Sequence, residues 1–226
     1  MKTLIIIPAR GGSKGVPNKN IKHLNGKPLI QYTIEAAKKI NKDRDICMTS
    51  DSDLIINTVK NIGLAVPFKR PSHLAEDNSG TYEVLLHAID FYKNKGIIYD
   101  TIILLQPTSP LRNEKHIQEA LALYTDDLDM LVSVKETESN PYYVLFEEDK
   151  EGYLQKSKEG NFTRRQDCPK VWEYNGAIYI INVKALLQKN MGEFRKIKKY
   201  IMDSESSLDI DTKLDFTLAE YLINNV

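Results

Sequence analysis

The chain has 226 residues, of which 42% are hydrophobic and 27% charged, and its 31 Lys and Arg balance 31 Asp and Glu. That composition excludes a disordered chain. The net charge of zero argues against nucleic acid or a membrane as partner, because a neutral protein does not attract these anionic partners at long range. The length suits one sizeable domain, which we expect to span residues 1–226.

Short apolar runs of strand length alternate with amphipathic helical stretches through much of the chain. The expected elements are a strand at 3–9, a helix at 28–40, a strand at 45–51, a helix at 52–63, a short strand at 63–71, a helix at 81–96, a strand at 100–106, a helix at 114–126 and a strand at 128–134. Such alternation is typical of an α/β fold with a mostly parallel sheet and helices on both faces. Ligands of these folds bind beyond the carboxyl ends of the strands.

The alternation is interrupted between about residues 136 and 174, a segment that we call the arm. It has turns, aromatic residues and period-two stretches but no long helical pattern, which predicts a small inserted antiparallel structure. After the arm we expect a strand at 177–183, a short helix at 184–190, a strand at 199–203 and a helix at 212–224.

The sequence also predicts a cytoplasmic protein. No apolar window is long enough for a transmembrane helix, and the apolar run after Lys2 stops at Pro8, too soon for a secretory signal. The two cysteines, Cys47 and Cys168, lack the spacing of a metal or redox motif. We expect them to be unpaired thiols in a reducing compartment.

The first strand leads into a segment rich in glycine and positive charge, residues 10–20, which we call the glycine–cation turn. Its polar and flexible residues are Arg10, Gly11, Gly12, Ser13, Lys14, Gly15, Lys19 and Asn20. Glycines permit left-handed or closely approached backbone, and consecutive N–H groups form anion-binding nests. An ordinary solvated turn is the alternative, but the position at a strand end favours a phosphate site. The turn matches neither a Walker loop nor the G-x-G-x-x-G motif.

Asp209 and Asp211 form what we call the acidic doublet. In an extended segment, residues two apart project to one face with their Cα atoms about 7 Å apart. Two carboxylates beside a polyphosphate suit Mg²⁺, which takes one or two protein oxygens and completes its shell with phosphate and water. Asp211 is alternatively a cap of the following helix, which leaves Asp209 unexplained between Leu208 and Ile210. The doublet therefore predicts a magnesium site.

Polar residues also follow the strand at 100–106, in a loop stiffened by two prolines. They are Gln106, Thr108, Ser109 and Arg112. A loop of this kind also suits the entry to a helix, and both interpretations are compatible with Gln106 facing a ligand.

Arg164 and Arg165 lie in the arm. Arginine binds carboxylates and phosphates through paired hydrogen bonds, but an ordinary surface pair explains them equally well. The four histidines have no ligand spacing and no G-x-S-x-G motif is present, so a histidine-based or nucleophilic site is not expected.

The stretches IIPARGGSKGVPNKNI, LQPTSPLR, RRQD, NGAIYI and SLDID occur in this order over nearly the whole chain. Together they resemble the acylneuraminate cytidylyltransferases, the CMP-sialic acid synthetases and their bacterial relatives. The resemblance implies a three-layer Rossmann-like nucleotidyltransferase fold. It also implies a Mg²⁺-dependent enzyme that joins CMP from CTP to a nine-carbon 2-keto sugar acid and releases pyrophosphate. Such enzymes are homodimers in which the arm of one subunit completes the sugar site of the other.

The resemblance implies roles for individual residues. Arg10, Ser13, Lys19 and Asn20, with the backbone of Gly11 and Gly12, would hold the CTP phosphates; Arg70 and Ser79 would contact the nucleotide; Gln106, Ser109, Tyr143, Arg164 and Arg165 would contact the sugar acid; Asp209 and Asp211 would bind the metal. Arg10, Lys19, Arg165 and Asp211 would also act in catalysis, which requires positioning and charge neutralisation while the sugar hydroxyl attacks the α-phosphorus.

Two departures from the family pattern leave the sugar acid open. Tyr142 and Tyr143 stand in the arm where many members have a lysine, and Thr81 stands where animal members have an arginine. N-acetylneuraminate, legionaminate and KDN all remain possible. The alternatives to this function are a CMP-KDO synthetase, a glycosyltransferase that uses a nucleotide sugar, and a non-catalytic nucleotide-sensing module.

Overall fold

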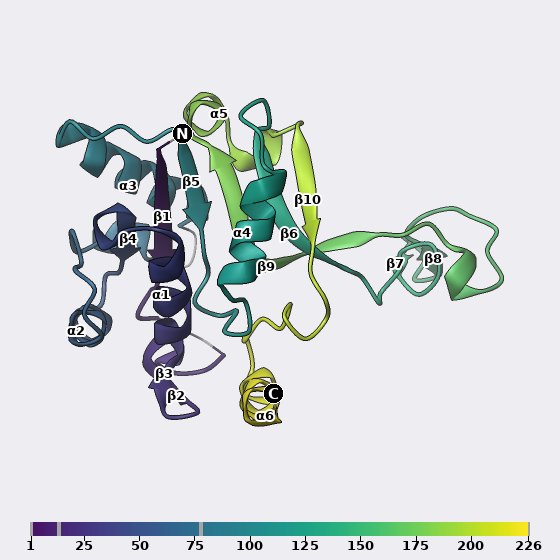
Figure 1. Ribbon diagram of the computed structural model, residues 1–226. Coiled ribbons are helices and arrows are strands. Elements are labelled where there is room, and N and C mark those ends of the chain that lie inside the picture. Colours follow the sequence, from purple (N-terminus) through teal and green to yellow (C-terminus); the bar gives the residue numbers. More distant parts are fainter. Residues whose placement is uncertain (1, 13–14, 77–78, 226) are drawn as a thin grey trace.

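A computed structural model describes residues 2–12, 15–76 and 79–225. Within these ranges the main sheet has six strands in the order β10-β6-β9-β5-β1-β4 (Figure 1). They are β1 (Thr3–Pro8), β4 (Ile46–Thr49), β5 (Thr101–Leu104), β6 (Met130–Glu136), β9 (Trp172–Asn182) and β10 (Ile197–Ile201). All run in one direction except β9, which is antiparallel to β5 and β6. The expected mostly parallel sheet is therefore confirmed.

Helices cover both faces of this sheet and complete the three layers. One face packs on α1 (Leu29–Ile40), α2 (Asp53–Asn61) and α4 (Glu114–Leu123), and the other on α3 (Thr81–Asn94) and α5 (Val183–Gln188). Alternate residues of β1 enter the two cores, Ile5 and Ile7 on one side, Leu4 and Ile6 on the other. This explains the uninterrupted apolar run of β1, because both of its faces are buried. Each helix in the described ranges is too short or too polar to cross a membrane.

A third apolar cluster joins the two ends of the chain. Its members, each at most 5% exposed, are Val16, Leu24, Leu29, Ile210, Phe216 and Ala219. Phe216 and Ala219 belong to α6 (Lys213–Asn225), Val16 belongs to the glycine–cation turn, and Ile210 lies between the two aspartates of the doublet. The cluster therefore packs the turn and the doublet segment against each other.

Leu24 of this cluster lies in a hairpin that was not predicted, formed by β2 (His23–Leu24) and β3 (Lys27–Pro28). Asn25 and Gly26 connect the two strands with φ of 46° and 79°. Positive φ at both central residues is what a type I′ turn requires. The Asn-Gly pair was a sequence signal for this hairpin.

One expected strand is wrong. Within the described residues the segment 63–71 pairs with the sheet only at Lys69, which bridges to Ser50. Pro67 and Pro71 have no N–H to offer to a ladder. The N–H of Arg70 still donates to the carbonyl of Ser50 at 2.8 Å, so the segment carries Arg70 to the carboxyl edge of the sheet.

The arm projects away from the body of the molecule, beyond the ends of β6 and β9 (Figure 1). At its base Lys135 and Glu136 of β6 still pair with Glu173 and Trp172 of β9. Its outer part holds a two-stranded antiparallel sheet of β7 (Phe146–Glu148) and β8 (Leu154–Lys156). The small antiparallel structure expected in this segment is present.

β9 carries a bulge beside the end of β5. Val132 pairs with Tyr179 and Val134 with Tyr174, so two steps along β6 correspond to five along β9. Gly176 lies in this bulge with φ of 74°, a conformation that favours glycine. Because β9 runs against its neighbours, the bulge lies beside the carboxyl end of β5 and opposite the middle of β6. Bulges often re-aim the chain next to a functional site.

A buried hydrogen-bonded network holds the bulge in place. Ser133 Oγ donates to Asn175 Oδ1 at 2.6 Å and accepts from the N–H of Ile178 at 2.8 Å. Asn175 Nδ2 in turn donates to Ser207 Oγ at 2.9 Å. All three side chains are buried. The network therefore ties β6 and β9 to the segment that leads into the acidic doublet.

We expect Gly176→Ala to lower the free energy of unfolding by about 1–3 kcal/mol, because alanine is strained at positive φ. Its Cβ would also lie 3.1 Å from Gln106 Oε1 and 3.4 Å from Asp209 Oδ2. Urea unfolding followed by circular dichroism measures the loss. Gly96→Ala is the matched control, since Gly96 has φ of 73° and no described atom within 4 Å of where a Cβ would lie. Equal losses in the two variants would exclude an effect of crowding at Gly176.

We expect Asn175→Ala to lower the free energy of unfolding by about 1–3 kcal/mol, because it leaves buried polar groups without their partner. The same unfolding measurement applies. The control is Asn225→Ala, which removes a hydrogen bond to the carbonyl of Tyr221 on the exposed end of α6 and should change stability by less than about 0.5 kcal/mol. If both substitutions cost the same, the network does not stabilise the bulge.

Candidate active site

Two adjoining pockets open at the carboxyl edge of the sheet. The first, the central pocket, has a volume of about 340 Å³ and is lined by Pro8, Arg10, Gly15, Lys19, Asn20, Gln106, Pro107, Thr108, Asp209 and Asp211. The second, the side pocket, has a volume of about 300 Å³, and Pro8 and Arg10 line it as well. Pro8 ends β1 and Gln106 follows β5, its parallel neighbour. The site therefore lies where this class of fold binds ligands.

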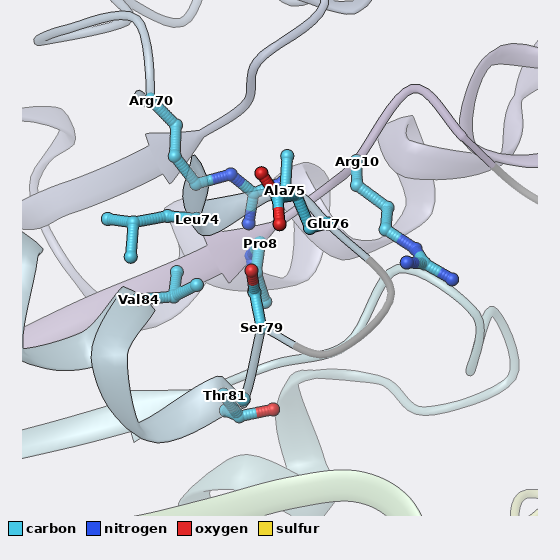
Figure 2. A pocket seen from close by; sticks show the side chains of 10 residues that line it. Pro8, Arg10, Arg70, Leu74, Ala75, Glu76, Ser79, Thr81 and Val84 are labelled. Carbon is cyan, nitrogen blue, oxygen red and sulfur yellow. The ribbon is translucent and has the colours of Figure 1, made fainter. Parts of the chain in front are cut away.

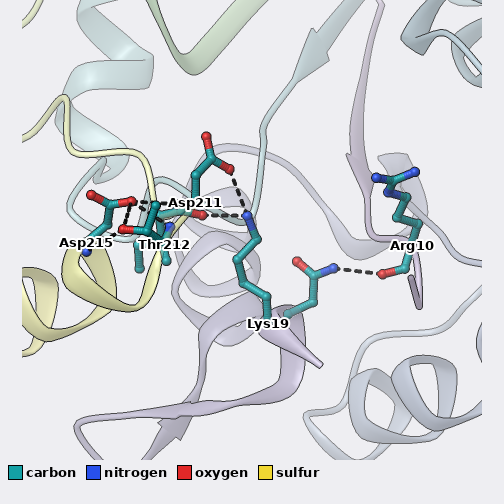
Figure 3. Close-up of polar contacts among 7 residues, drawn as sticks. Arg10, Lys19, Asp211, Thr212 and Asp215 are labelled. Atoms are coloured by element: carbon teal, nitrogen blue, oxygen red, sulfur yellow. Dashed lines mark hydrogen bonds and ion pairs between the residues drawn. The ribbon is translucent and has the colours of Figure 1, made fainter. Parts of the chain in front are cut away.

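The glycine–cation turn and the acidic doublet meet in the central pocket (Figure 3). Lys19 Nζ lies 3.0 Å from Asp211 Oδ1 and donates to the carbonyl of Ile210 at 2.5 Å. The N–H of Ile210 donates to the carbonyl of Thr108 at 2.9 Å. Three segments that are far apart in the sequence thus converge on one space, and the segments in which the sequence predicts a phosphate site and a magnesium site lie side by side.

Inside the turn the backbone is held by specific contacts. Lys19 begins a short 3-10 helix (Lys19–Ile21) after Asn18, whose φ is 53°. The side chain of Asn20 is buried and donates to the carbonyl of Arg10 at 3.1 Å. Gly15 is needed for close approach, because a Cβ there would collide with the carbonyl oxygen of Asp211.

Gly12, by contrast, is exposed, and a Cβ there would meet no described atom within 4 Å. Of the glycines expected to allow a left-handed or closely approached backbone, Gly11 and Gly15 lie in close approach, because a Cβ at Gly11 would also lie 3.1 Å from Ser52 Cβ. Ser13 and Lys14 lie outside the described residues.

Asp51, at the end of β4, anchors the turn and was missed in the sequence. Its Oδ1 accepts from the N–H of Gly11 at 3.1 Å and from Arg70 Nη2 at 3.3 Å. Burial lowers the pKa of Arg70, and the contact with Asp51 opposes that shift. One carboxylate therefore holds two groups that were expected to bind nucleotide. Its position as the last residue of the strand predicted at 45–51 was the available signal.

The side pocket contains both other residues expected to contact nucleotide. It is lined by Pro8, Arg10, Arg70, Leu74, Ala75, Glu76, Ser79, Gly80, Thr81 and Val84. Figure 2 shows Arg70 and Ser79 on facing sides of this space, with Arg10 extending away from them. Ser79 Oγ donates to the carbonyl of His73 at 2.6 Å, which ties Ser79 to the short 3-10 helix Ser72–Leu74. Arg10 therefore separates a compartment with Arg70 and Ser79 from one with Lys19 and the doublet.

The two aspartates of the doublet differ in environment. Burial raises the pKa of Asp209, and Asp211 acts in the same direction, whereas Thr108 and Lys19 lower it. The side chain of Asp211 is 75% exposed. Asp209 Oδ1 is buried and has no hydrogen-bond partner among the described residues, which is costly for a carboxylate oxygen. A bound cation would satisfy this atom.

The donor set fits a hard divalent ion that shares its ligands with phosphate. In the described part of the chain, no three side chains of His, Cys, Asp or Glu are grouped so that they could hold a metal ion. The doublet offers two carboxylates, and Mg²⁺ commonly takes one or two from protein and the rest from phosphate and water. Asp209 and Asp211 are therefore suitable Mg²⁺ ligands once a triphosphate is present.

Of the loop after β5, only part reaches the central pocket. Gln106 and Thr108 line it, whereas Ser109 is fully buried and does not, so the structure does not bring Ser109 to the expected substrate site. Arg112 is buried below the loop, where Nη2 donates to Thr33 Oγ1 at 2.7 Å and to the carbonyl of Gln106 at 3.4 Å. Burial lowers its pKa to about 10. Arg112 supports Gln106 from beneath.

The arm residues expected to contact sugar acid lie outside both pockets of the same chain. Arg164 pairs with Asp167 through contacts of 2.8 and 2.9 Å. Arg165 lines a separate hollow at the base of the arm, together with Glu136 and Lys170. Tyr143 is 37% exposed. Within one chain these residues are not brought to Gln106 and the doublet.

The cytidylyltransferase family model matches residues 4–225 of this chain. A Campylobacter coli protein named post-translational flagellin modification protein B is 37% identical over 225 residues, which cover 97% of this chain and 94% of that protein. A CMP-N,N'-diacetyllegionaminic acid synthase of Campylobacter jejuni is 36% identical over 226 residues, which cover 98% of this chain and 94% of that protein. An N-acylneuraminate cytidylyltransferase of Streptococcus agalactiae is 37% identical over 96% of this chain but only 52% of its own length. The chain spans about half of that relative.

The fold has a close counterpart among solved structures. A CMP:2-keto-3-deoxy-manno-octonic acid synthetase complexed with CTP superposes with a TM-score of 0.73, covering 100% of this chain and 99% of that one, at 17% identity. Such low identity supports the Rossmann-like nucleotidyltransferase fold alone. The family match and the named relatives go further: this chain belongs to the cytidylyltransferase family.

Proposed function

We propose that this protein is a CMP-nonulosonic acid synthetase, which transfers CMP from CTP to the anomeric hydroxyl of a nine-carbon 2-keto sugar acid and releases pyrophosphate. The observation that carries this proposal is the central pocket, where Arg10 and Lys19 lie with Asp209 and Asp211. Cations suit a triphosphate, and two carboxylates suit its metal ion. The names of the relatives favour a nine-carbon acid, whereas the eight-carbon alternative rests on similarity of fold.

In this mechanism the hydroxyl oxygen attacks the α-phosphorus, and the bond between that phosphorus and the pyrophosphate oxygen breaks. Negative charge accumulates on the leaving pyrophosphate. Arg10 and Lys19 are positioned to neutralise that charge, and the exposed carboxylate of Asp211 is the candidate acceptor of the hydroxyl proton. Magnesium held by the doublet would supply further charge neutralisation. The nucleoside would occupy the side pocket, against Arg70 and Ser79.

The acceptor site needs a cation for the carboxylate of the sugar acid, and we assign it to Arg165 of a second copy. Support comes from the arm, which projects from the body and keeps Arg165 outside the pockets of its own chain. Exposed apolar side chains of the arm are Tyr143, Val144, Leu145, Phe146, Tyr153 and Leu154. An exposed apolar patch of this kind marks a protein interface. The proposed assembly is a homodimer with exchanged arms.

We also propose that the enzyme acts in the cytoplasm. Cys47 is a buried thiol whose pKa burial raises to about 12, and Cys168 is partly buried. Both are free thiols, which suits a reducing compartment.

The test of the reaction is incubation with CTP, Mg²⁺ and a panel of sugar acids: N-acetylneuraminate, legionaminate, KDN and KDO. Mass spectrometry reads the CMP conjugate, and pyrophosphate release gives the rate. We expect conjugates with one or more nine-carbon acids and none without Mg²⁺. A conjugate with KDO alone would favour the eight-carbon alternative. CTP binding without any conjugate would favour a nucleotide-sensing module.

In the same assay, Arg10→Ala and Asp211→Ala should each lower kcat/KM at least about a hundredfold, because Arg10 supplies positive charge to the pyrophosphate and Asp211 would hold the metal ion that does the same. Asp127→Ala is the control, since Asp127 is an exposed aspartate at the opposite edge of the sheet. Circular dichroism verifies that the variants are folded. Wild-type turnover in either active-site variant would exclude the assigned role.

The exchanged arm predicts complementation between two inactive variants. In a mixture of Arg165→Ala and Asp211→Ala chains that reassociate at random, half of the dimers are mixed, and each has one intact site made of Asp211 from one chain and Arg165 from the other. We expect about a quarter of wild-type activity. If Arg165 acted within its own chain, the mixture would stay inactive.

A further inference from the structure

The ammonium group of Lys19 lies against the doublet segment, where a metal cation would be expected to bind. Its Nζ donates to the carbonyl of Ile210 at 2.5 Å and lies 3.0 Å from Asp211 Oδ1 (Figure 3). Its charge also favours the ionised form of Asp209. The side chain is only 13% exposed. A surface ion pair usually has water around both partners, whereas this lysine side chain is largely buried and its ammonium contacts two oxygen atoms of one segment.

The backbone of the doublet is held rigidly on the other sides. Ile210 is fully buried in the third apolar cluster, and its N–H is bonded to Thr108. The carbonyl of Asp211 faces Gly15 so closely that no Cβ fits between them. The N–H of Asp211 donates to Asp215 Oδ2 at 3.0 Å. The doublet therefore has little room to move, and the flexible part of this contact is the lysine side chain.

The charges of the described residues that line the central pocket balance without a ligand. Arg10 and Lys19 contribute two positive charges, and Asp209 and Asp211 contribute two negative charges. A free divalent cation would meet the ammonium within about 3 Å of the carboxylate oxygen that it has to bind, where repulsion is strong in a partly buried site. A triphosphate changes this balance, because its negative charge offers the ammonium another partner.

We infer that Lys19 is an internal counter-ion that keeps divalent metal off the doublet until a nucleoside triphosphate is present. This inference rests on the proposed function. When the triphosphate enters, the ammonium moves from Ile210 and Asp211 to phosphate oxygens, and the vacated carboxylate becomes available to the metal. Lysine suits this exchange, since its charge sits at the end of a flexible four-carbon stem. Metal and nucleotide then bind cooperatively, and each raises the affinity for the other by the same factor.

The experiment measures Mn²⁺ binding by the electron paramagnetic resonance signal of the free ion, without sugar acid and so without turnover. Because CTP binds Mn²⁺ in solution, the Mn²⁺ bound by CTP alone is measured without protein and subtracted. The variants are Lys19→Met, which keeps the length of the stem and removes the charge, and Lys19→Arg, which keeps the charge. Lys22→Met is the matched control, because Lys22 lies three residues away and contacts the ring of Phe216 instead of the doublet.

Without CTP, we expect Lys19→Met to bind Mn²⁺ at least about tenfold more tightly than the wild type, the size of a typical coupling between sites. Lys19→Arg and Lys22→Met should stay close to the wild type. With CTP, wild-type affinity for Mn²⁺ should rise by about the same factor or more. Lys19→Met should show a smaller increase on addition of CTP, because its doublet is already accessible.

Three outcomes would overturn the inference. The first is that, without CTP, folded Lys19→Met binds Mn²⁺ no more tightly than the wild type, while CTP still raises the wild-type affinity. That result would exclude the proposed role of Lys19 and leave the proposed metal site in place. The second is tight Mn²⁺ binding by the wild type without CTP, because Lys19 would then not keep metal off the doublet. The third is no Mn²⁺ binding by the wild type even with CTP, in which case the proposed metal site falls and the inference with it.

Discussion

A single ammonium group, that of Lys19, joins the beginning and the end of this chain at the site. It contacts Asp211 across 192 positions of sequence. Two carboxylates in one partly buried segment repel each other, and without a nearby positive charge the segment would favour protonation or exposure. The apolar cluster around Ile210 and Phe216 supplies the packing for this arrangement, and Lys19 supplies the charge. The central pocket depends on both.

The antiparallel strand β9 is the second constraint on the site. In a purely parallel sheet, the residues at the carboxyl edge are the last residues of their strands. β9 instead enters the sheet at that edge and brings Asn175 and Gly176 to it early in the strand. Its bulge leaves room for the side chains of Gln106 and Asp209. The buried network that joins Asn175 to Ser133 and Ser207 connects the bulge to β6 and to the segment before Asp209. The same strand also forms one side of the base of the arm, so pocket and arm share one structural element.

Nucleotide and acceptor chemistry are divided between different parts of the molecule. The pockets on either side of Arg10 offer cations, carboxylates and a polar loop within one chain. The arm holds Arg165 in a hollow at its base and an exposed apolar surface farther out. This division supports the proposed exchanged dimer, in which the arm of a second copy would supply Arg165 for the substrate carboxylate.

From the sequence alone, local periodicity determined the alternating elements, and the order of the motifs determined the family. The rule that ligands lie at strand ends also identified the glycine–cation turn and Gln106, because apolar runs and the turns that follow them are local signals. The doublet was identified by the spacing of its two carboxylates. Tertiary structure alone decided that the segment 63–71 is no strand, that Ser109 and Arg112 are buried, and that Asp51 and Asn175 anchor the site. It also decided that Arg165 lies outside the pockets of its own chain. The physical reason is that burial and partner choice depend on contacts between residues 40 or more apart, which no local pattern records.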